Sequence, residues 1–296
     1  MSAEIIDGKK VAVLVRESVR EDVEQWMTKG NRAPFLQVVL VGDDPASIVY
    51  TGTKTKACKD VGIETNTLEL QDTISAKELK EVIQELNNDD SVDGILVQMP
   101  LPSHLSQYDV IESIDHRKDV DGFHPMNVGR LSVGQPCFKS CTPAGVMELF
   151  KYYSIPVKSK HAVVVGASNI VGSPMAVMLS RENSSGKATT TICHKYTRDL
   201  TQHTINADIL IVAAGQPHLI KKEMVKEGVV IVDVGINRIA DETSEKGYKL
   251  VGDVDFESVK QKASWITPVP GGVGPMTVAM LMKNTLLAAK KSIYPD

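Results

Sequence analysis

Hydrophobic positions in the first half of the chain alternate between helical spacing and short apolar runs. Residues 9–29 place apolar side chains three or four positions apart, which predicts an amphipathic helix. The β-branched run at 36–41 predicts a strand, because a turn signal, Gly42-Asp43-Asp44-Pro45, closes it. The pattern then predicts helices at 47–60 and 75–87 and strands at 64–70 and 94–98.

The second half repeats this alternation. An apolar run at 161–165 predicts a strand, and a glycine-rich turn leads from it into a helix that begins near Val171. Further strands are expected at 188–193, 209–213 and 229–234, and helices at 142–153 and 275–291. Strands that alternate with helices indicate parallel sheets. We therefore expect an α/β fold with two α/β domains and a cleft between them: residues 1–145, completed by the C-terminal helix 275–296, and residues 146–274.

The composition is that of an ordinary globular protein. The 296 residues are 42% hydrophobic and 24% charged, and the net charge of −4 gives no reason to expect nucleic acid or an anionic membrane as partner. The N-terminal residues do not resemble a signal peptide, and no apolar run approaches the ~18–20 residues that span a bilayer. Four scattered cysteines predict neither a disulfide framework nor a metal site, so we expect reduced thiols and a cytoplasmic location.

The glycine-rich turn after residue 165 is a candidate phosphate site. It reads Gly166-Ala167-Ser168-Asn169-Ile170-Val171-Gly172, and glycines in such a turn let the backbone approach a pyrophosphate at a helix N-terminus. The turn departs from the G-x-G-x-x-G pattern, because Ser168 holds the second position and the last glycine comes one residue late. The strand before it and the helix after it predict a Rossmann-type dinucleotide-binding domain, with a plain tight connection as the alternative.

The residues after the second strand of that domain bear on the choice of cofactor. An NAD site places Asp or Glu about 20 residues beyond the glycine turn, where it binds the ribose 2′-hydroxyl. This chain instead has His194-Lys195-Tyr196-Thr197-Arg198 in that region. A cation suits the 2′-phosphate of NADP, so the sequence favours NADP, with solvated loop charges as the alternative interpretation.

Polar residues in the first half are candidates for a ligand site. Tyr50 and Lys54 lie four residues apart on one face of a predicted helix, where a phenol beside an ammonium suits a proton relay. Gln98 ends a predicted strand, where an amide can orient a ligand. The loop 118–125 carries two carboxylates, including Asp121, that suit a ligand with several N–H donors. Each feature also has a plain structural interpretation, as a surface pair, a strand-end amide or a turn.

The segment 267–275 has an unusual composition. It contains three prolines and three glycines directly before a predicted helix, which combines stiffness with bare backbone. We predict that this segment is a ligand-contact loop.

Taken in order, these stretches resemble the bifunctional methylenetetrahydrofolate dehydrogenase/cyclohydrolase family (FolD-like) over nearly the whole chain. The most specific motif is Pro268–Thr277. The other motifs are Val41–Ser47 with Tyr50 and Lys54, Gly94–Pro102, Lys118–Pro125, Cys141–Pro143, Gly166–Gly172 and Val234–Asn237.

The resemblance implies an NADP-dependent enzyme that oxidises 5,10-methylenetetrahydrofolate to 5,10-methenyltetrahydrofolate and hydrolyses that product to 10-formyltetrahydrofolate. It makes residues 1–145 the catalytic, folate-binding domain and residues 146–274 the NADP-binding domain. The family's catalytic lysine falls on Lys54, with Tyr50, Gln98 and Asp121 as its catalytic partners. The same resemblance implies a homodimer.

The family's binding residues also fall on particular positions of this chain. Substrate contacts fall on Tyr50, Thr51, Gly52, Thr53, Lys54, Val97, Gln98, Met99, Asp121, Pro270, Gly271, Gly272, Val273 and Gly274. Cofactor contacts fall on Thr142, Gly166, Ala167, Ser168, Ile170, Val171, His194, Lys195, Ala214, Gly215, Ile236 and Thr277. Some family members have an arginine directly after the first glycine, where this chain has Ala167, and Lys195 is then the matching candidate for the 2′-phosphate.

Three alternatives remain at this point. The first is an NAD-dependent or dehydrogenase-only member of the same family. The second is a nucleotide-sensing protein that kept the fold without the reaction. The third is an unrelated dehydrogenase acting on a hydroxy acid, for which we would expect a catalytic histidine paired with an arginine.

Overall fold

The computed structural model describes residues 3–181, 186–244 and 247–295, and its chain divides into two compact units. The N-terminal unit comprises residues 13–141 together with 278–296, and the central unit comprises residues 1–12 together with 142–277. Residue 296, the last of the expected C-terminal helix, lies outside the described residues. Each unit is built around its own parallel sheet.

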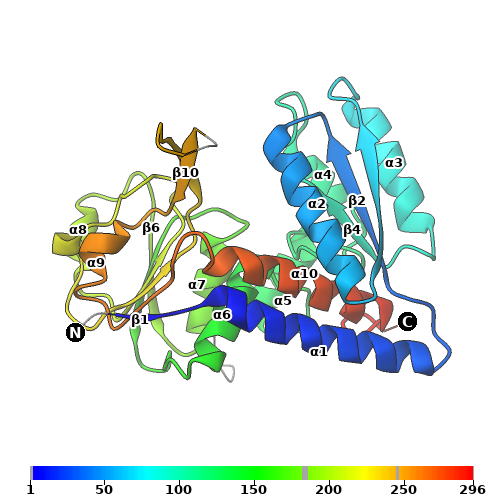
Figure 1. The fold of residues 1–296 in the computed structure, drawn as a ribbon. Helices are drawn as coiled ribbons and strands as arrows, with labels where there is room; N and C mark the ends of the chain where they lie inside the picture. The colour runs from blue at the N-terminus through cyan, green and yellow to red at the C-terminus, as the bar shows by residue number, and fades with distance from the viewer. Residues whose placement is uncertain (1–2, 182–185, 245–246, 296) are drawn as a thin grey trace. The chain divides into compact units, whose positions relative to one another are not determined.

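The N-terminal unit has a three-stranded parallel sheet in the order β3-β2-β4. Its strands are β2 (Phe35–Val41), β3 (Glu64–Leu70) and β4 (Gly94–Val97), and its helices include α2 (Pro45–Asp60), α3 (Ala76–Asn88), α4 (Gln107–Ser113) and α5 (Pro125–Val133). Figure 1 shows α2 and α3 on opposite sides of this sheet. Val39 and Val97 of the sheet pack with Leu79 and Ile83 of α3 in one buried cluster. This burial removes apolar surface from water and fixes the strand register.

Local sequence signals set the starts of two helices in this unit. Pro45 begins α2, and the carboxylate of Asp44 accepts a hydrogen bond from the backbone N–H of Ser47 at 2.8 Å. Ser75 and Glu78 form a capping box at α3, because each side chain accepts a hydrogen bond from the other residue's backbone N–H. Such caps satisfy N–H groups that the first helical turn leaves without partners.

The central unit has a six-stranded parallel sheet in the order β1-β11-β8-β7-β5-β6. The strands are β1 (Glu4–Ile5), β5 (His161–Val165), β6 (Thr189–Cys193), β7 (Ile209–Val212), β8 (Val230–Asp233) and β11 (Trp265–Ile266). The helices of the unit include α7 (Gly172–Ser180), α8 (Leu200–Thr204) and α9 (Phe256–Val259), and an antiparallel hairpin joins β9 (Asn237–Ala240) to β10 (Tyr248–Val251). Because the central strands are buried on both faces, their sequences are apolar runs, apart from Asp233 at the end of β8.

Three helices pass from one unit into the other. They are α1 (Gly8–Thr28), α6 (Cys141–Tyr152) and α10 (Val273–Ala289).

The predicted α/β fold with parallel sheets is confirmed, and the predicted strands and long helices are present with ends that shift by at most two residues. The exception is the C-terminal helix expected over 275–296, which ends at Ala289. The sequence interpretation did not include β1, α4, α5, α8, β9, β10, α9 and β11.

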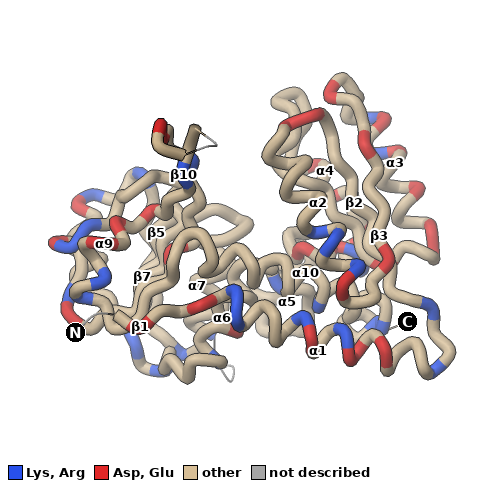
Figure 2. Tube along the Cα trace, in the orientation of Figure 1, with Lys and Arg blue, Asp and Glu red and all other residues tan. Residues whose placement is uncertain are grey.

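Charge and cysteine placement fit the composition. Acidic and basic residues are mixed along both units in Figure 2, so neither sign dominates a long stretch of chain. All four cysteines are free and buried: Cys58, Cys137, Cys141 and Cys193. Within residues 3–181, 186–244 and 247–295, no helix has the length and apolar character needed to cross a membrane.

Candidate active site

Lys54 lies at the centre of a polar cluster in the N-terminal unit. It belongs to α2, its side chain is 6% exposed, and its Nζ donates a hydrogen bond to Oε1 of Gln98 at 3.0 Å. Gln98 follows β4 directly, and its Nε2 donates to the carbonyl of Met99 at 2.6 Å, so its oxygen is turned toward the ammonium. The ammonium also lies 4.7 Å from the ring centroid of Tyr50, one helical turn earlier. The predicted pairing of Tyr50 with Lys54 is therefore present, and Gln98 joins it.

The Asp121 carboxylate completes this cluster. The segment before it runs beside β4, because Ile95 pairs with Asp119 in a parallel bridge. Burial raises the pKa of Asp121 to about 6, and the charge of Lys54 opposes that rise. Burial and the charge of Asp121 together raise the pKa of Tyr50 to about 12, although the tyrosine as a whole stays 36% exposed. Near neutral pH the cluster thus holds an un-ionised phenol and, beside Lys54, a carboxylate close to its titration point.

Cys141 is a member of the cluster that the sequence interpretation did not propose as a site residue. Its thiol is 1% exposed and lies within hydrogen-bonding reach of the Asp121 carboxylate and, at 3.5 Å, of the Val120 carbonyl. Burial and the charge of Asp121 raise the pKa of this thiol well above its usual range. Cys141 is therefore a neutral neighbour of the carboxylate. It begins the motif Cys141–Pro143, which was the available sequence signal for it.

The other predicted substrate residues of this unit occupy different surroundings. Thr51 and Gly52 line a hollow with residues of β3, and Lys54 is not among the residues that line it. Thr53 is exposed, and its hydroxyl donates to the carbonyl of Val49 at 3.0 Å. Val97 is buried in the sheet core and Met99 is half-buried. The structure thus brings Tyr50, Lys54, Gln98 and Asp121 together, while Thr51 and Gly52 face another part of the surface.

The predicted contact loop 270–274 belongs to the central unit and begins α10. Gly271 has a φ of +109°, and its carbonyl accepts a hydrogen bond from the backbone N–H of Lys9 at 3.1 Å. A Cβ on Gly8 would lie 1.7 Å from the Gly272 carbonyl oxygen, so the two chain segments touch through bare backbone. Pro270 is exposed, Val273 is buried and Gly274 is half-buried. Glycine is required here by a left-handed backbone and by close packing.

The glycine turn of the central unit has the geometry of a close backbone approach. Gly166 has a φ of +119°, and a Cβ on it would lie 2.1 Å from the Ala213 carbonyl oxygen. A Cβ on Gly172 would lie 1.9 Å from the Gly166 carbonyl oxygen. The hydroxyl of Ser168 accepts hydrogen bonds from the backbone N–H groups of Val171 and Gly172 at the start of α7. Ala167 and Ser168 are exposed and Ile170 and Val171 are half-buried, so the turn fits a pyrophosphate held against α7.

The loops after β6, β7 and β8 follow the carboxyl ends of parallel strands in one sheet, the usual ligand-binding edge of such a sheet. After β6, His194 and Lys195 are exposed, and the Lys195 ammonium lies 5.0 Å from the ring centroid of Tyr196. After β7, Ala214 and Gly215 are exposed, and after β8 so is Ile236. The hydroxyls of Thr142 and Thr277 lie 2.9 Å apart. Lys195 is thus an exposed cation at the same edge of the sheet as the glycine turn, and this combination suits a dinucleotide that carries an extra phosphate.

Two buried carboxylates that the sequence interpretation missed hold these loops. Asp253 accepts hydrogen bonds from the backbone N–H groups of Ala214 at 2.6 Å and Gly215 at 2.8 Å. Asp233 accepts from the backbone N–H groups of Asp253 at 3.0 Å and Val254 at 2.9 Å. Burial raises the pKa of Asp233 to about 7. Among the described residues, no group of three or more His, Cys, Asp or Glu side chains is placed to hold a metal ion.

Two family models match the chain. One, the catalytic domain of tetrahydrofolate dehydrogenase/cyclohydrolase, matches residues 6–121, and the other, the NAD(P)-binding domain of the same family, matches residues 140–293. The bifunctional protein FolD of Bacteroides thetaiotaomicron is 50% identical over 290 residues, which cover 98% of this chain and 99% of that protein.

Solved structures agree with these matches. The bifunctional FolD enzyme of Campylobacter jejuni has a TM-score of 0.92 and 50% identity, and the match covers 98% of this chain and 100% of that one. The methylenetetrahydrofolate dehydrogenase-cyclohydrolase of Trypanosoma brucei, solved with NADP and an inhibitor, has a TM-score of 0.93 and 35% identity over all of both chains. The resemblance drawn from the sequence motifs is confirmed, and this chain belongs to the tetrahydrofolate dehydrogenase/cyclohydrolase family.

Proposed function

We propose that this chain catalyses two consecutive reactions on a folate one-carbon unit. The first is the NADP-dependent oxidation of 5,10-methylenetetrahydrofolate to 5,10-methenyltetrahydrofolate, and the second is hydrolysis of that product to 10-formyltetrahydrofolate. Family membership supports the pair of reactions. The observation that carries the proposal is the buried Lys54 ammonium, which Gln98 holds beside Asp121.

The oxidation removes a hydride from the folate methylene carbon and leaves a methenyl cation. NADP, when bound, supplies the nicotinamide C4 that accepts this hydride. Because the step needs no strong acid or base, the residues act mainly by binding and orientation. We assign the pyrophosphate to the turn from Gly166 to Gly172 and the 2′-phosphate to Lys195. The loops containing Ala214 and Ile236 are the proposed nicotinamide contacts.

The hydrolysis requires proton movement. Water adds its oxygen to the methenyl carbon and loses a proton, and the bond from that carbon to N5 then breaks. N5 gains a proton, the formyl group stays on N10, and one proton is released overall. Lys54 is the proposed proton carrier, because its Nζ is buried and is held at 3.0 Å from Oε1 of Gln98. Asp121 is proposed to bind N–H groups of the pteridine ring, and Tyr50 to lie against it.

Further assignments complete the proposal. Residues 1–145 with 275–296 are the proposed folate-binding domain, to which residues 270–274 add contacts, and residues 146–274 are the proposed NADP-binding domain. The four buried free thiols support a cytoplasmic location. The family resemblance supports a homodimer.

Substitution of the lysine tests the proposal. We expect Lys54→Met to lower the rate of methenyltetrahydrofolate hydrolysis by about 100-fold or more, the usual worth of a positioned proton carrier. Lys56→Met is the matched control, because Lys56 is an exposed lysine of the same helix and should leave hydrolysis unchanged. Hydrolysis is followed by the loss of methenyl absorbance, and oxidation by its gain with NADP or NAD. Wild-type hydrolysis by Lys54→Met would remove the lysine from the mechanism, and equal oxidation rates with NAD would contradict the assignment of NADP.

A further inference from the structure

We propose that Tyr294, near the C-terminus, is a positioning residue for the Asp121 carboxylate and thereby for folate recognition. It acts through Asn127 and Asp119. This inference rests on the proposed folate site. All four residues belong to the N-terminal unit.

Asp119 organises the loop that carries Asp121. Its carboxylate is 2% exposed and accepts hydrogen bonds from the backbone N–H groups of Gly122 at 3.1 Å, Phe123 at 3.2 Å and His124 at 2.8 Å. The backbone from 119 to 124 therefore loops around this one side chain, and Asp121 belongs to that loop. Movement of the Asp119 carboxylate would shift the backbone on the C-terminal side of Asp121.

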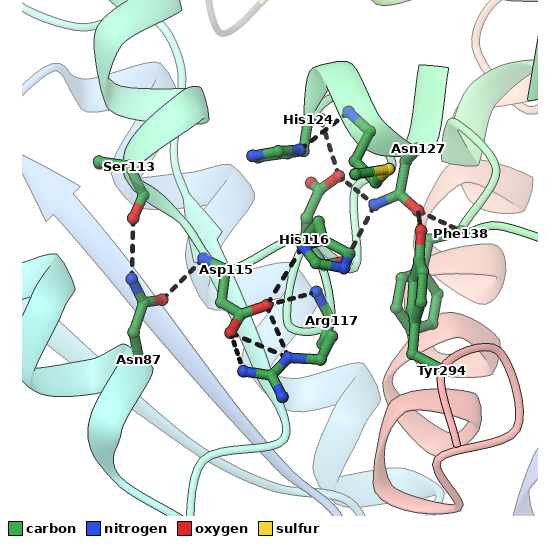
Figure 3. A network of polar contacts seen from close by, with 11 residues as sticks. Asn87, Ser113, Asp115, His116, Arg117, His124, Asn127, Phe138 and Tyr294 are labelled. Atoms are coloured by element: carbon green, nitrogen blue, oxygen red, sulfur yellow. Dashed lines mark hydrogen bonds and ion pairs between the residues drawn. The ribbon is translucent and has the colours of Figure 1, made fainter. Parts of the chain in front are cut away.

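The Asn127 side chain holds the Asp119 carboxylate in place by a hydrogen bond. Its Nδ2 donates to Oδ2 of Asp119 at 2.8 Å and to the His116 carbonyl at 3.0 Å. Its Oδ1 accepts from the Phe138 backbone N–H at 3.1 Å and from the Tyr294 hydroxyl at 2.6 Å. These four bonds use both donors and both acceptor positions of the amide, so its orientation is determined. Figure 3 shows Tyr294 and Phe138 side by side with Asn127 between them and His124.

The Tyr294 ring is packed as well as hydrogen-bonded. Its centroid lies 4.7 Å from the His116 ring in an edge-to-face arrangement and 5.9 Å from the Phe138 ring. The Arg130 guanidinium lies 5.0 Å from the same centroid. These contacts do not involve the hydroxyl, so Phe at position 294 would keep them while losing only the bond to Asn127. The Oδ1 of Asn127 would still accept from Phe138, and no buried donor would lose its partner.

The C-terminal segment also makes a hydrogen bond to Val120, the residue directly before Asp121. Nδ2 of Asn284, in α10, donates to the Val120 carbonyl at 2.8 Å and to the Lys139 carbonyl at 3.0 Å. The loop is thus tied to the C-terminal segment on both sides of Asp121. The catalytic cluster itself contains no residue of that segment, so its contribution is to place the carboxylate.

The test is the Tyr294→Phe substitution, made alone and together with Asp121→Asn. For Tyr294→Phe we expect a three- to tenfold higher KM for methylenetetrahydrofolate, roughly the worth of one neutral hydrogen bond, with kcat and the KM for NADP little changed. Asp121→Asn should raise the folate KM by itself. In that background Tyr294→Phe should add nothing further, because it acts through the missing carboxylate. Tyr108→Phe is the matched control, a 69% exposed tyrosine of the same unit.

The outcomes separate this inference from the proposed function. If Asp121→Asn weakens folate binding while Tyr294→Phe matches the Tyr108→Phe control, the positioning role is wrong and the folate site stands. An equal rise in KM in both backgrounds would show that Tyr294 acts without Asp121, which also overturns the inference. If Asp121→Asn leaves the folate KM unchanged, the proposed folate contact itself is wrong, and the positioning role fails with it.

Discussion

The Asp121→Asn substitution removes a carboxylate that burial holds partly protonated near neutral pH. Its pKa is about 6 in the folded chain, raised from 3.8 by burial despite the attraction of Lys54. Between these two values the folded state binds a proton that the unfolded chain has already released. The free energy of unfolding therefore falls as the pH rises through this window, and it levels off above the folded pKa. An amide at this position carries no such cost.

The size of the effect follows from the shift. A rise of about two pKa units corresponds to roughly 3 kcal/mol at pH 8. Asp121 is only half-buried, so solvent screening reduces this to about 1.5 kcal/mol, and about half of that remains at pH 5. We expect Asp121→Asn to be more stable than the wild type by these amounts, and to bind folate less tightly.

Urea unfolding at pH 5 and pH 8 measures the difference. The chain has two tryptophans, of which Trp26 lies in the N-terminal unit and Trp265 in the central unit. In a Trp265→Phe background, tryptophan fluorescence therefore reports the unit that contains Asp121. Asp43→Asn, at an exposed aspartate of the same unit, is the control. Equal stability at pH 8, or a gain that is the same at both pH values, would refute the reasoning.

Two further predictions concern the cofactor. Lys195→Ala should raise the KM for NADP about tenfold and leave the KM for NAD unchanged, because it removes a cation proposed to pair with the 2′-phosphate. If the ratio of kcat/KM for NADP over NAD does not change, the 2′-phosphate is bound by another residue. Asp253→Ala should raise the KM for NADP about tenfold without changing the KM for folate, because the backbone N–H groups of Ala214 and Gly215 lose their acceptor. Steady-state kinetics checks both, and a matching loss for folate would mean that Asp253 supports more than the cofactor loop.

The strands predicted most closely were those with the strongest local signals. The runs at 36–41, 64–70 and 161–165 became β2, β3 and β5 with a change of at most one residue at either end. β2 and β5 are nearly continuous runs of apolar residues, whereas β3 mixes threonine and leucine with polar residues and is only partly buried. Helix α3 begins directly after Ser75, as the capping pattern predicts.

Elements that depend on distant partners were not predicted. Strand β1 has two residues and exists because it pairs with β11, whose residues lie 261 positions further along the chain. Helix α5 follows a loop that looked merely polar, although Pro125 at its first position was a usable signal. The β9–β10 hairpin is formed by two four-residue strands with only weak alternation.

The site residues also divide into those that local sequence could predict and those that only the folded chain brings together. Tyr50 and Lys54 could be paired from their spacing on one helix, and Gln98 from its place at a strand end. No local pattern could bring Tyr294 to Asn127, which is 167 residues earlier in the chain. Asp119 lies two residues before Asp121, and only the folded loop shows that it is the organising carboxylate of the pair.

The shielding of all four native thiols matters for labelling experiments. Cys58, Cys137, Cys141 and Cys193 are between 0% and 6% exposed, so a maleimide reagent meets no reactive group on the native surface. One cysteine introduced at an exposed position would therefore carry a fluorophore or spin label at that site alone. Covalent cross-linking between molecules during aerobic storage is disfavoured for the same reason.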